Sequence, residues 1–247
     1  MPNQTVQIPS VDGDLSAYLA APASPDESRP GVLVLHEAFG LNDDMRRIAR
    51  RFAENGYVAL APDLYSLGPR LKPICIRRAM GELQSGSGRT FDDIEAAHTW
   101  LAARDNVDDT RIAVAGFCMG GGFAILHAAR SDVAAAADFY GAVPKDSHAL
   151  DGICPVLGAY GARDGVFGAQ AERLRGHLEE LGVEHEVDVY PDAGHSFMSQ
   201  YGPVLSIVVK FSPMNAGYHE PSAEAAWTTM LDFFERHLGG TTEPTET

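Results

Sequence analysis

The 247-residue sequence has little positive charge, few cysteines and no long apolar run. Lys and Arg number 19 against 34 Asp and Glu, and a net charge of −15 is unsuited to binding nucleic-acid phosphates. The three cysteines are too few and too widely spaced for a disulfide framework, which favours a reducing compartment. No apolar run approaches a membrane span, and the first ten residues lack the features of a secretory signal. We therefore expect a cytoplasmic protein that binds neither nucleic acid nor membrane.

The remaining composition is that of an ordinary globular protein. Hydrophobic residues make up 45% of the chain, which is enough for a large core, and 247 residues allow one large α/β domain or two small ones. We find no internal repeat and no linker that would divide the chain. The sequence therefore predicts a single domain over residues 1–240, followed by a disordered polar tail at 241–247.

Predicted strands alternate with predicted helices along most of the chain. A hairpin, Thr5–Ile8 and Leu15–Leu19, comes first. The other predicted strands are Gly31–Leu35, Tyr57–Ala61, Ile112–Ala115, Val133–Tyr140, Pro155–Tyr160 and Glu186–Tyr190. The predicted helices are Met45–Glu54 (capped by Asp43 or Asp44), Ile74–Leu83, Phe91–Ala103, Gly121–Ala129, Ala169–Leu181 and Ala223–Leu238. This order predicts an α/β fold, a mostly parallel twisted sheet with helices on both faces. Active sites of such sheets lie beyond the carboxyl ends of the strands.

Two irregular segments, residues 66–90 and 199–221, contain glycines and prolines and are expected to lie over the active site. The first holds several arginines and the short helix Ile74–Leu83. The second is rich in Val, Ile, Phe and Met, so it could line an apolar pocket for an acyl group, cover part of the core or form a subunit contact.

The stretch Arg111–Leu126 has the pattern of a nucleophile elbow. An apolar run leads into Gly116-Phe117-Cys118-Met119-Gly120, and small apolar residues follow as a predicted helix. In the pattern Gly-x-nucleophile-x-Gly the turn is so tight that its glycine positions cannot carry a Cβ, and this geometry lifts Cys118 above the edge of the sheet. The helix N-terminus then offers free N–H groups to a thiolate. A phosphate-binding loop is the alternative, but the glycine spacing does not fit G-x-G-x-x-G and no Lys-Ser/Thr follows.

Two further strand ends supply candidate partners for Cys118. Asp164 and His195 each follow a predicted strand, and the order nucleophile, acid, histidine is that of an α/β-hydrolase triad. Of nine histidines, only His195 both follows a predicted strand and stands beside a glycine. His195 would accept the thiol proton and later activate water, and Asp164 would orient the imidazole. Asp63 and Asp192 also lie after strands and are alternatives to Asp164.

Glu37 lies in the loop where α/β hydrolases place a second oxyanion donor. By position that donor is the backbone N–H of Ala38, or of Phe39, alongside the N–H of Met119. A carboxylate at this place is costly unless it has a partner. Glu37 could hydrogen-bond the Cys118 thiol, hold a segment of the active site, or pair with an arginine.

Five motifs occur in order over nearly the whole chain: His36-Glu37-Ala38-Phe39-Gly40-Leu41-Asn42, Ala61-Pro62-Asp63-Leu64-Tyr65, Gly116-Phe117-Cys118-Met119-Gly120-Gly121, Gly161-x-x-Asp164 and Gly194-His195-Ser196-Phe197. With these motifs the sequence resembles the dienelactone hydrolase family. The resemblance implies an α/β-hydrolase fold and a Cys-His-Asp triad that opens enol-lactone or ester bonds through an acyl-cysteine. It also implies that Glu37 engages the resting thiol and helps convert it to a thiolate when substrate enters.

One departure from the family bears on the substrate. Members that act on dienelactone bind its carboxylate with arginines, one of them shortly after the triad histidine, whereas residues 196–200 here read Ser-Phe-Met-Ser-Gln. Arg77, Arg78 or Arg89 could supply such a clamp, although a solvated surface role is the favoured alternative. Phe39 and Phe197 are further candidate substrate contacts.

Together these patterns predict a cysteine-nucleophile hydrolase of small lactones or esters. We expect no metal, no organic cofactor and a monomer or homodimer. A thiol redox sensor that uses Cys118 without turnover is a rival hypothesis, and a non-catalytic binding protein on the same fold is another. The complete triad argues against the second of these.

Overall fold

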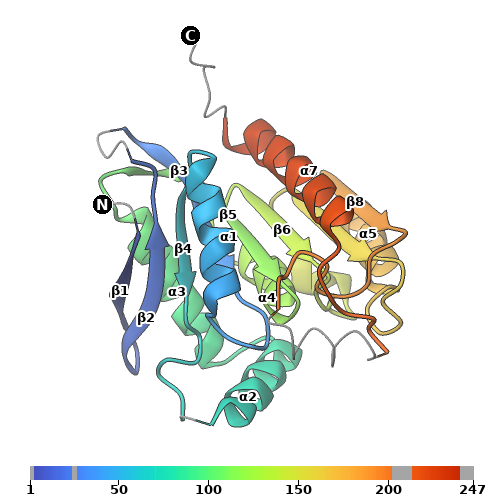
Figure 1. The fold of residues 1–247 in the computed structure, drawn as a ribbon, viewed down its shortest axis with the longest axis horizontal. Coiled ribbons are helices and arrows are strands. Elements are labelled where there is room, and N and C mark those ends of the chain that lie inside the picture. Colours follow the sequence, from blue (N-terminus) through green and yellow to red (C-terminus); the bar gives the residue numbers. More distant parts are fainter. Residues whose placement is uncertain (1–2, 24–26, 70, 202–212, 240–247) are drawn as a thin grey trace.

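A computed structural model describes residues 3–23, 27–69, 71–201 and 213–239, which contain one eight-stranded sheet (Figure 1). The strands are β1 (Asn3–Ser10), β2 (Gly13–Ala20), β3 (Arg29–Leu35), β4 (Val58–Pro62), β5 (Val107–Phe117), β6 (Ala135–Phe139), β7 (Val156–Gly161) and β8 (His185–Tyr190). Their order in the sheet is β1-β2-β4-β3-β5-β6-β7-β8. β2 pairs antiparallel with β1 and with β4, and the pairs from β4 to β8 are parallel. The predicted fold class is confirmed.

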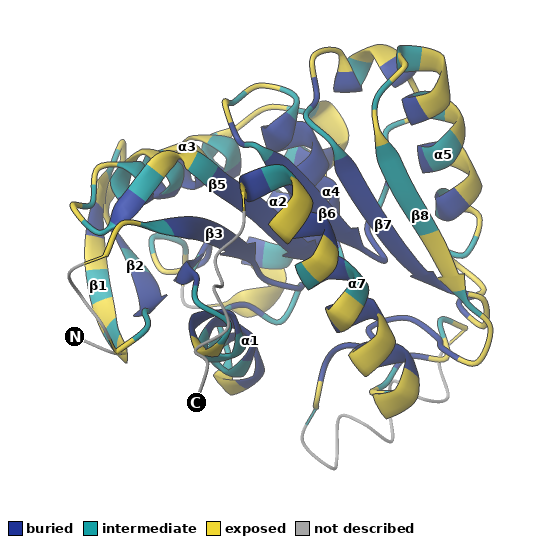
Figure 2. Ribbon diagram, turned by 90° about the horizontal axis from the view of Figure 1, so that it is seen from above, coloured by how far each residue is buried: buried dark blue, intermediate teal, exposed yellow. Residues whose placement is uncertain are grey.

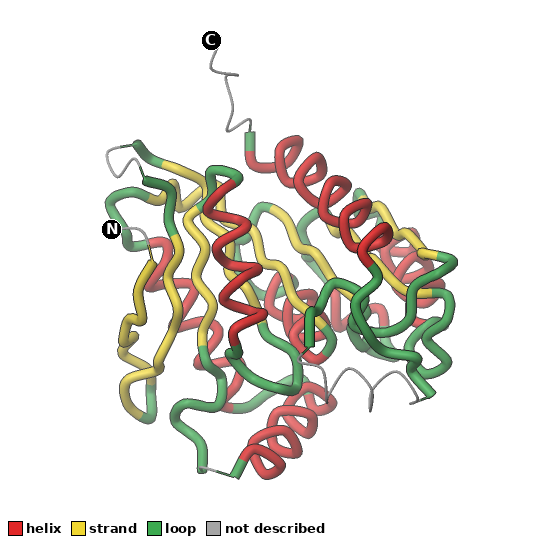
Figure 3. Tube along the Cα trace, in the orientation of Figure 1, coloured by secondary structure: helices red, strands yellow, loops and turns green. Residues whose placement is uncertain are grey.

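Helices cover both faces of this sheet, as Figure 3 shows. On one face lie α1 (Asp43–Glu54) and α7 (Glu220–Leu238), and on the other lie α3 (Arg89–Ala102), α4 (Met119–Ala128) and α5 (Gln170–Leu181). Helix α2 (Lys72–Ser85) packs against α4, and a short 3₁₀ helix, η1 (Ser147–Leu150), precedes β7. None of the helices in the described ranges is long and apolar enough to cross a membrane. The predicted tail at 241–247 lies outside the described residues.

The hydrophobic core lies on both faces of the sheet, between the strands and the helices that cover them. Strands β4, β6 and β7 are buried along their whole length, whereas the edge strands β1 and β8 have exposed positions (Figure 2). Continuous apolar runs suit central parallel strands because helices cover both of their sides. Between α1 and α7 the rings of Phe52 and Trp227 lie 4.7 Å apart, so the two helices close one layer of the core.

Several predicted boundaries need correction. Helix α1 is capped by Asn42, whose side-chain oxygen accepts a hydrogen bond from the Met45 N–H at 3.0 Å, and not by Asp43 or Asp44. The Asp44 carboxylate accepts a hydrogen bond from Arg47 at 2.8 Å instead. Helix α4 begins at Met119, two residues earlier than predicted, because the turn at the nucleophile is tighter than the glycine run suggests.

The turn from β5 into α4 depends on two close backbone approaches. A Cβ on Gly116 would lie 2.0 Å from the carbonyl oxygen of Gly120, and a Cβ on Gly120 would lie 2.2 Å from the carbonyl oxygen of Leu35. Neither obstacle is a flexible side chain, so nothing can move aside cheaply. The prediction that the two glycine positions of the elbow, 116 and 120, cannot carry a Cβ is confirmed.

Replacing Gly120 with Ala should therefore destabilise the fold. We expect a loss of about 1–3 kcal/mol in the free energy of unfolding, the usual range for an overpacked site, measured by urea denaturation. Gly81→Ala on α2 is the matched control, because a Cβ there meets nothing within 4 Å. That control should gain roughly 0.5–1 kcal/mol from helix propensity. Equal stability of Gly120→Ala and the parent would contradict this account of the turn.

Candidate active site

The carboxyl ends of β5, β7 and β8 bring Cys118, Asp164 and His195 to one edge of the sheet. The Nδ1 of His195 donates a hydrogen bond to Oδ2 of Asp164 at 2.6 Å, and both side chains are buried. Asp63 and Asp192 do not compete for this position. The Asp63 carboxylate caps its own turn through the Tyr65 N–H, and Asp192 pairs with Arg163 on the surface at 2.6 Å.

Cys118 sits in a conformation that non-glycine residues rarely adopt. Its φ and ψ angles are 54° and −116°, and it is the N-cap residue of α4. The Cys118 N–H donates to the carbonyl oxygen of Phe139 at 2.9 Å, which ties the turn to the end of β6. This backbone holds the half-buried thiol at the positive end of the α4 dipole, where negative charge on sulfur is favoured.

The electrostatic surroundings of His195 favour its charged form. Burial lowers the pKa of the imidazole, but the hydrogen bond to Asp164 and the nearby sulfur of Cys118 outweigh it and raise the pKa to about 10. The Nε2 atom is buried and has no hydrogen-bond partner among the described residues. Nδ1 of His195 is therefore fixed by Asp164, and Nε2 is the atom that would hold, at this raised pKa, a proton taken from the thiol or from water.

Asp164 is prepared to remain ionised. Burial would raise the pKa of its carboxyl, but the hydrogen bonds from His195 and from the backbone hold the pKa below its ordinary value. The N–H groups of Val166 and Phe167 each donate to Oδ1 at 2.9 Å. The two carboxylate oxygens are thus divided, one for the backbone and one for the imidazole.

Two aromatic rings and close contacts of the neighbouring backbone fix the position of His195. Its ring centroid lies 5.0 Å from that of Tyr140 and 4.8 Å from that of Phe167. The His195 N–H donates to the Met214 carbonyl at 3.0 Å. A Cβ on Gly194 would lie 1.9 Å from the carbonyl oxygen of Asn215, which explains the glycine beside the histidine.

The two residues predicted to supply the oxyanion N–H groups, Ala38 and Met119, both contact the Tyr65 hydroxyl. The hydroxyl of Tyr65 donates to the carbonyl oxygen of Ala38 at 3.2 Å and lies 3.7 Å from the Met119 sulfur. Within the described ranges, the backbone N–H groups of Ala38 and Met119 have no hydrogen-bond partner. Two free N–H groups beside the nucleophile are what stabilisation of an oxyanion requires.

Glu37 holds a segment of the site, one of the alternatives that its sequence position allows. The buried carboxylate accepts hydrogen bonds from the Ser199 hydroxyl at 2.7 Å and the Tyr201 hydroxyl at 2.5 Å. Within the described chain it makes no hydrogen bond to the Cys118 thiol and no ion pair with an arginine. The contact with the resting thiol that the family resemblance implies is therefore absent from this conformation.

Residues 196–201, which we call the arm, have further attachments. The carbonyl oxygen of Met198 accepts a hydrogen bond from Arg47 of α1 at 3.1 Å, and the Tyr140 hydroxyl lies 3.2 Å from that of Ser199. Ser196 has a φ of 53°, so the chain turns sharply after His195. The arm thus links Glu37, α1 and the aromatic surroundings of His195. Residues 202–212 of the predicted loop lie outside the described part of the chain.

The candidate substrate contacts differ in their surroundings. Phe39 is half-buried and its ring centroid lies 5.5 Å from that of Tyr201 on the arm. Phe197 has an exposed fraction of 0% and packs against Tyr140 and Tyr190, so it supports the arm and offers no surface to a substrate. The prediction of a substrate contact at Phe197 is corrected by this burial.

The arginines of the segment 66–90 do not form a clamp in this conformation. Arg77 is exposed on α2, and Arg78 donates to the carbonyl oxygen of Leu64 at 3.3 Å. Arg89 lies 3.1 Å from Asp12 and 3.4 Å from Asp93. These contacts agree with the solvated or paired role that was the favoured alternative.

Four residues of the site had no role assigned from the sequence: Tyr65, Tyr140, Ser199 and Tyr201. Tyr65 lies in one of the five motifs, which was a signal for it. The other three have no local pattern, because their partners come from distant strand ends. Tyr201, for example, contacts Glu37 across 164 positions.

Comparisons with known proteins agree with this architecture. Residues 15–238 match the family model described as the Dienelactone hydrolase family. Proteins provisionally named carboxymethylenebutenolidase, from Yersinia pestis and Salmonella typhimurium, are 34% and 32% identical to the chain. The alignments cover 93% and 94% of this chain and 86% of each relative.

Solved structures are similar over the same range. A provisional dienelactone hydrolase from Klebsiella pneumoniae matches with a TM-score of 0.77 and 30% identity, covering 95% of this chain and 98% of that one. A dienelactone hydrolase-like promiscuous phosphotriesterase from metagenomic libraries matches with a TM-score of 0.81 and 25% identity, covering 97% of this chain and 100% of that one.

Replacing Asp164 with Asn should lower the pKa of His195, because Asn keeps the shape of the side chain but removes its negative charge. In the parent, the pKa of His195 is raised from 6.5 to about 10. The protonated imidazole therefore contributes to the free energy of unfolding. This contribution is complete below pH 6.5 and is lost as the pH rises through about 10. The free energy of unfolding should fall over this range in the parent and fall less in Asp164→Asn.

Urea denaturation at a series of pH values measures this difference, and imidazole ¹⁵N shifts report the pKa directly. Asp192→Asn is the control, because Asp192 also follows a strand but is exposed and paired with Arg163. Identical pH profiles for parent and Asp164→Asn would contradict the electrostatic role of Asp164.

Proposed function

Because the chain belongs to the dienelactone hydrolase family, we propose that it hydrolyses small lactones or esters through an acyl-cysteine intermediate. The observation that supports this most is the arrangement at three strand ends. A cysteine at a helix N-terminus lies near an imidazole whose other nitrogen is hydrogen-bonded to a buried carboxylate. This is the constellation of an activated nucleophile.

The first half of the proposed reaction acylates the enzyme. The Nε2 of His195 accepts the proton of the Cys118 thiol, and the sulfur attacks the carbonyl carbon of the substrate. The backbone N–H groups of Ala38 and Met119 would stabilise the oxyanion that forms. When the tetrahedral intermediate collapses, the carbon–oxygen bond of the ester or lactone breaks, and the leaving oxygen takes the proton from His195. In a lactone, this oxygen stays attached to the acyl group as a free hydroxyl or enol.

The second half releases the product. His195 removes a proton from water, the resulting hydroxide attacks the thioester carbon, and a second oxyanion forms in the same place. Its collapse breaks the carbon–sulfur bond and releases a carboxylic acid. Cys118 leaves as a thiolate that recovers its proton from His195. Asp164 stabilises the imidazolium in both halves without changing its own charge.

We propose that Glu37 positions the arm beside the nucleophile. Its two hydrogen bonds to Ser199 and Tyr201 support this role. The cytoplasmic location and the monomeric or homodimeric state remain predictions from the sequence.

The Cys118→Ala variant should lose hydrolysis of p-nitrophenyl acetate or of an enol lactone. We expect kcat/KM to fall by at least about 1,000-fold, because removing the nucleophile removes the covalent route. Cys154→Ala is the matched control. Burial raises the pKa of the Cys154 thiol to about 12, so it is inert, and this variant should keep the parent rate.

Equal rates for Cys118→Ala and the parent would refute the mechanism. The rival hypothesis of a redox sensor without turnover predicts instead that the parent itself hydrolyses none of these substrates, while peroxide reversibly oxidises Cys118.

Substrates without a free carboxylate should be hydrolysed at least as well as matched substrates that carry one. The chain has a net charge of −15, no arginine follows His195 within residues 196–200, and Arg78 and Arg89 contact protein groups. A panel of lactones and esters in matched pairs, compared by kcat/KM, measures this preference. A preference for the carboxylates of about 10-fold or more would contradict it. In that case, loss of the preference in Arg77→Gln would identify the clamp.

A further inference from the structure

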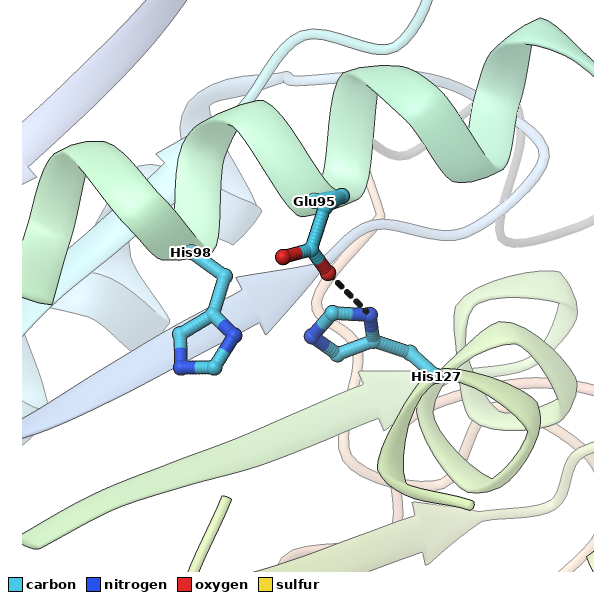
Figure 4. Close-up of side chains that lie close together, drawn as sticks. All are labelled: Glu95, His98 and His127. Atoms are coloured by element: carbon cyan, nitrogen blue, oxygen red, sulfur yellow. Dashed lines mark ion pairs between the residues drawn. The ribbon is translucent and has the colours of Figure 1, made fainter. Parts of the chain in front are cut away.

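A second cluster of chemically active side chains lies away from the triad, between α3 and α4 (Figure 4). Glu95 and His98 are one turn apart on α3, and His127 is in the last turn of α4. Residues three positions apart on a helix share a face, so the Glu-x-x-His pair presents both side chains to the same neighbour. The proposed hydrolysis uses none of these residues.

The three side chains converge on a common space. One ligand atom from each lies within 4.8 Å of those of the others, and the two imidazole centroids are 5.2 Å apart. The Nδ1 of His127 lies 3.8 Å from Oε2 of Glu95, which is too long for a hydrogen bond. Figure 4 shows the two imidazole rings side by side with the Glu95 carboxylate above them, one His127 nitrogen facing Glu95 and the other on the side of His98.

His127 carries an unsatisfied nitrogen in this cluster. The residue has an exposed fraction of only 3%, and its buried Nε2 has no hydrogen-bond partner among the described residues. Buried polar atoms are normally paired, so such an atom points to a ligand. Burial, together with the charges near it, lowers the pKa of His127 to about 3, and burial also lowers the pKa of His98. Both shifts favour the neutral imidazole, which is the form that binds a metal ion.

We propose that Glu95, His98 and His127 form a binding site for a divalent transition-metal ion, with Zn²⁺ the best match. Two imidazoles and one carboxylate are a zinc ligand set, and Glu-x-x-His on a helix is a known way to supply two of them. Ligand atoms around tetrahedral zinc lie about 3.3 Å apart, so the cluster needs to close by up to about 1.5 Å. The exposed Glu95 side chain can move this far, and water would fill the fourth position.

The charged groups near the cluster have opposite effects on the binding of a cation. Asp132 lies close enough to raise the pKa of His98, and Glu95 adds a second negative charge. The guanidinium of Arg130 acts in the other direction on His127, although it donates to the Gly86 carbonyl at 2.6 Å and stacks on Phe91. We therefore expect moderate affinity for the metal ion, in the micromolar range.

A bound ion would connect α3 to the C-terminal end of α4, whose N-terminal end carries Cys118. The three ligands come together only in the folded protein. Because a bound ion would stabilise the folded state over the unfolded state, it should raise the melting temperature. The inference does not depend on the proposed hydrolysis, and its test uses protein in which the nucleophile is removed.

The experiment uses untagged, chelator-treated Cys118→Ser protein, because a thiolate and His195 at the active site would bind zinc themselves. Titration with Zn²⁺ by calorimetry should show one equivalent bound at micromolar concentration. Co²⁺ should give visible absorption bands without the near-ultraviolet band of thiolate ligation. His98→Gln and Glu95→Gln, each added to this background, should weaken binding by about 10-fold or more.

His148→Gln is the matched control. His148 is an exposed histidine 3.3 Å from the Asp151 carboxylate, but it has no second imidazole beside it. This variant should bind Zn²⁺ as tightly as the Cys118→Ser background. Absence of binding below about 100 μM, or equal affinities for the background, His98→Gln and Glu95→Gln, would overturn the proposal. Glu95 is exposed, and Gln can replace the partly buried His98 with a side chain that is also polar, so the variants should fold, and circular dichroism verifies this.

Discussion

The architecture of this protein depends on the contact between the backbone of the β5–α4 turn and the end of β3. Gly116 and Gly120 allow main-chain atoms to approach where any Cβ would collide with carbonyl groups. This contact puts Cys118 into a φ of 54° and aims the start of α4 at its sulfur. The same contact brings the loop after β3, with Glu37 and Ala38, next to the nucleophile. One steric constraint thus positions both the thiol and the groups that would stabilise its reaction.

Three buried carboxylates surround this turn, and each is satisfied in a different way. Asp164 accepts from His195 and from two backbone N–H groups, which keeps it ionised. Glu37 accepts from two hydroxyls of the arm. Asp138, near the end of β6, accepts from the Tyr160 hydroxyl and the Gly141 N–H, and burial raises its pKa to about 6. Because a buried charge without a partner is costly, these contacts fix the geometry as well as the charge.

The site and the candidate metal cluster occupy opposite ends of α4. Cys118 caps its first turn, and His127 lies in its last. The hydrolase site is built from loops at strand ends, whereas the cluster is built from the packed sides of two helices. The fold that this chain shares with its relatives accounts for the first position. The metal cluster arises instead from individual residues where α3 packs beside the end of α4.

The sequence by itself determined the order of strands and helices, the elbow at Cys118 and the strand-end positions of Asp164 and His195. These features are local: apolar runs, glycines beside a nucleophile and polar residues after a strand are visible within a few positions. Only the tertiary structure decided that Asn42 caps α1, that Phe197 is buried and that Glu37 holds the arm. The partner of Glu37 at Ser199 lies 162 positions away, and no local pattern encodes a contact between such distant residues. Packing of the strands against one another chooses those partners, because burial forces each polar group to bond with whatever the fold places beside it.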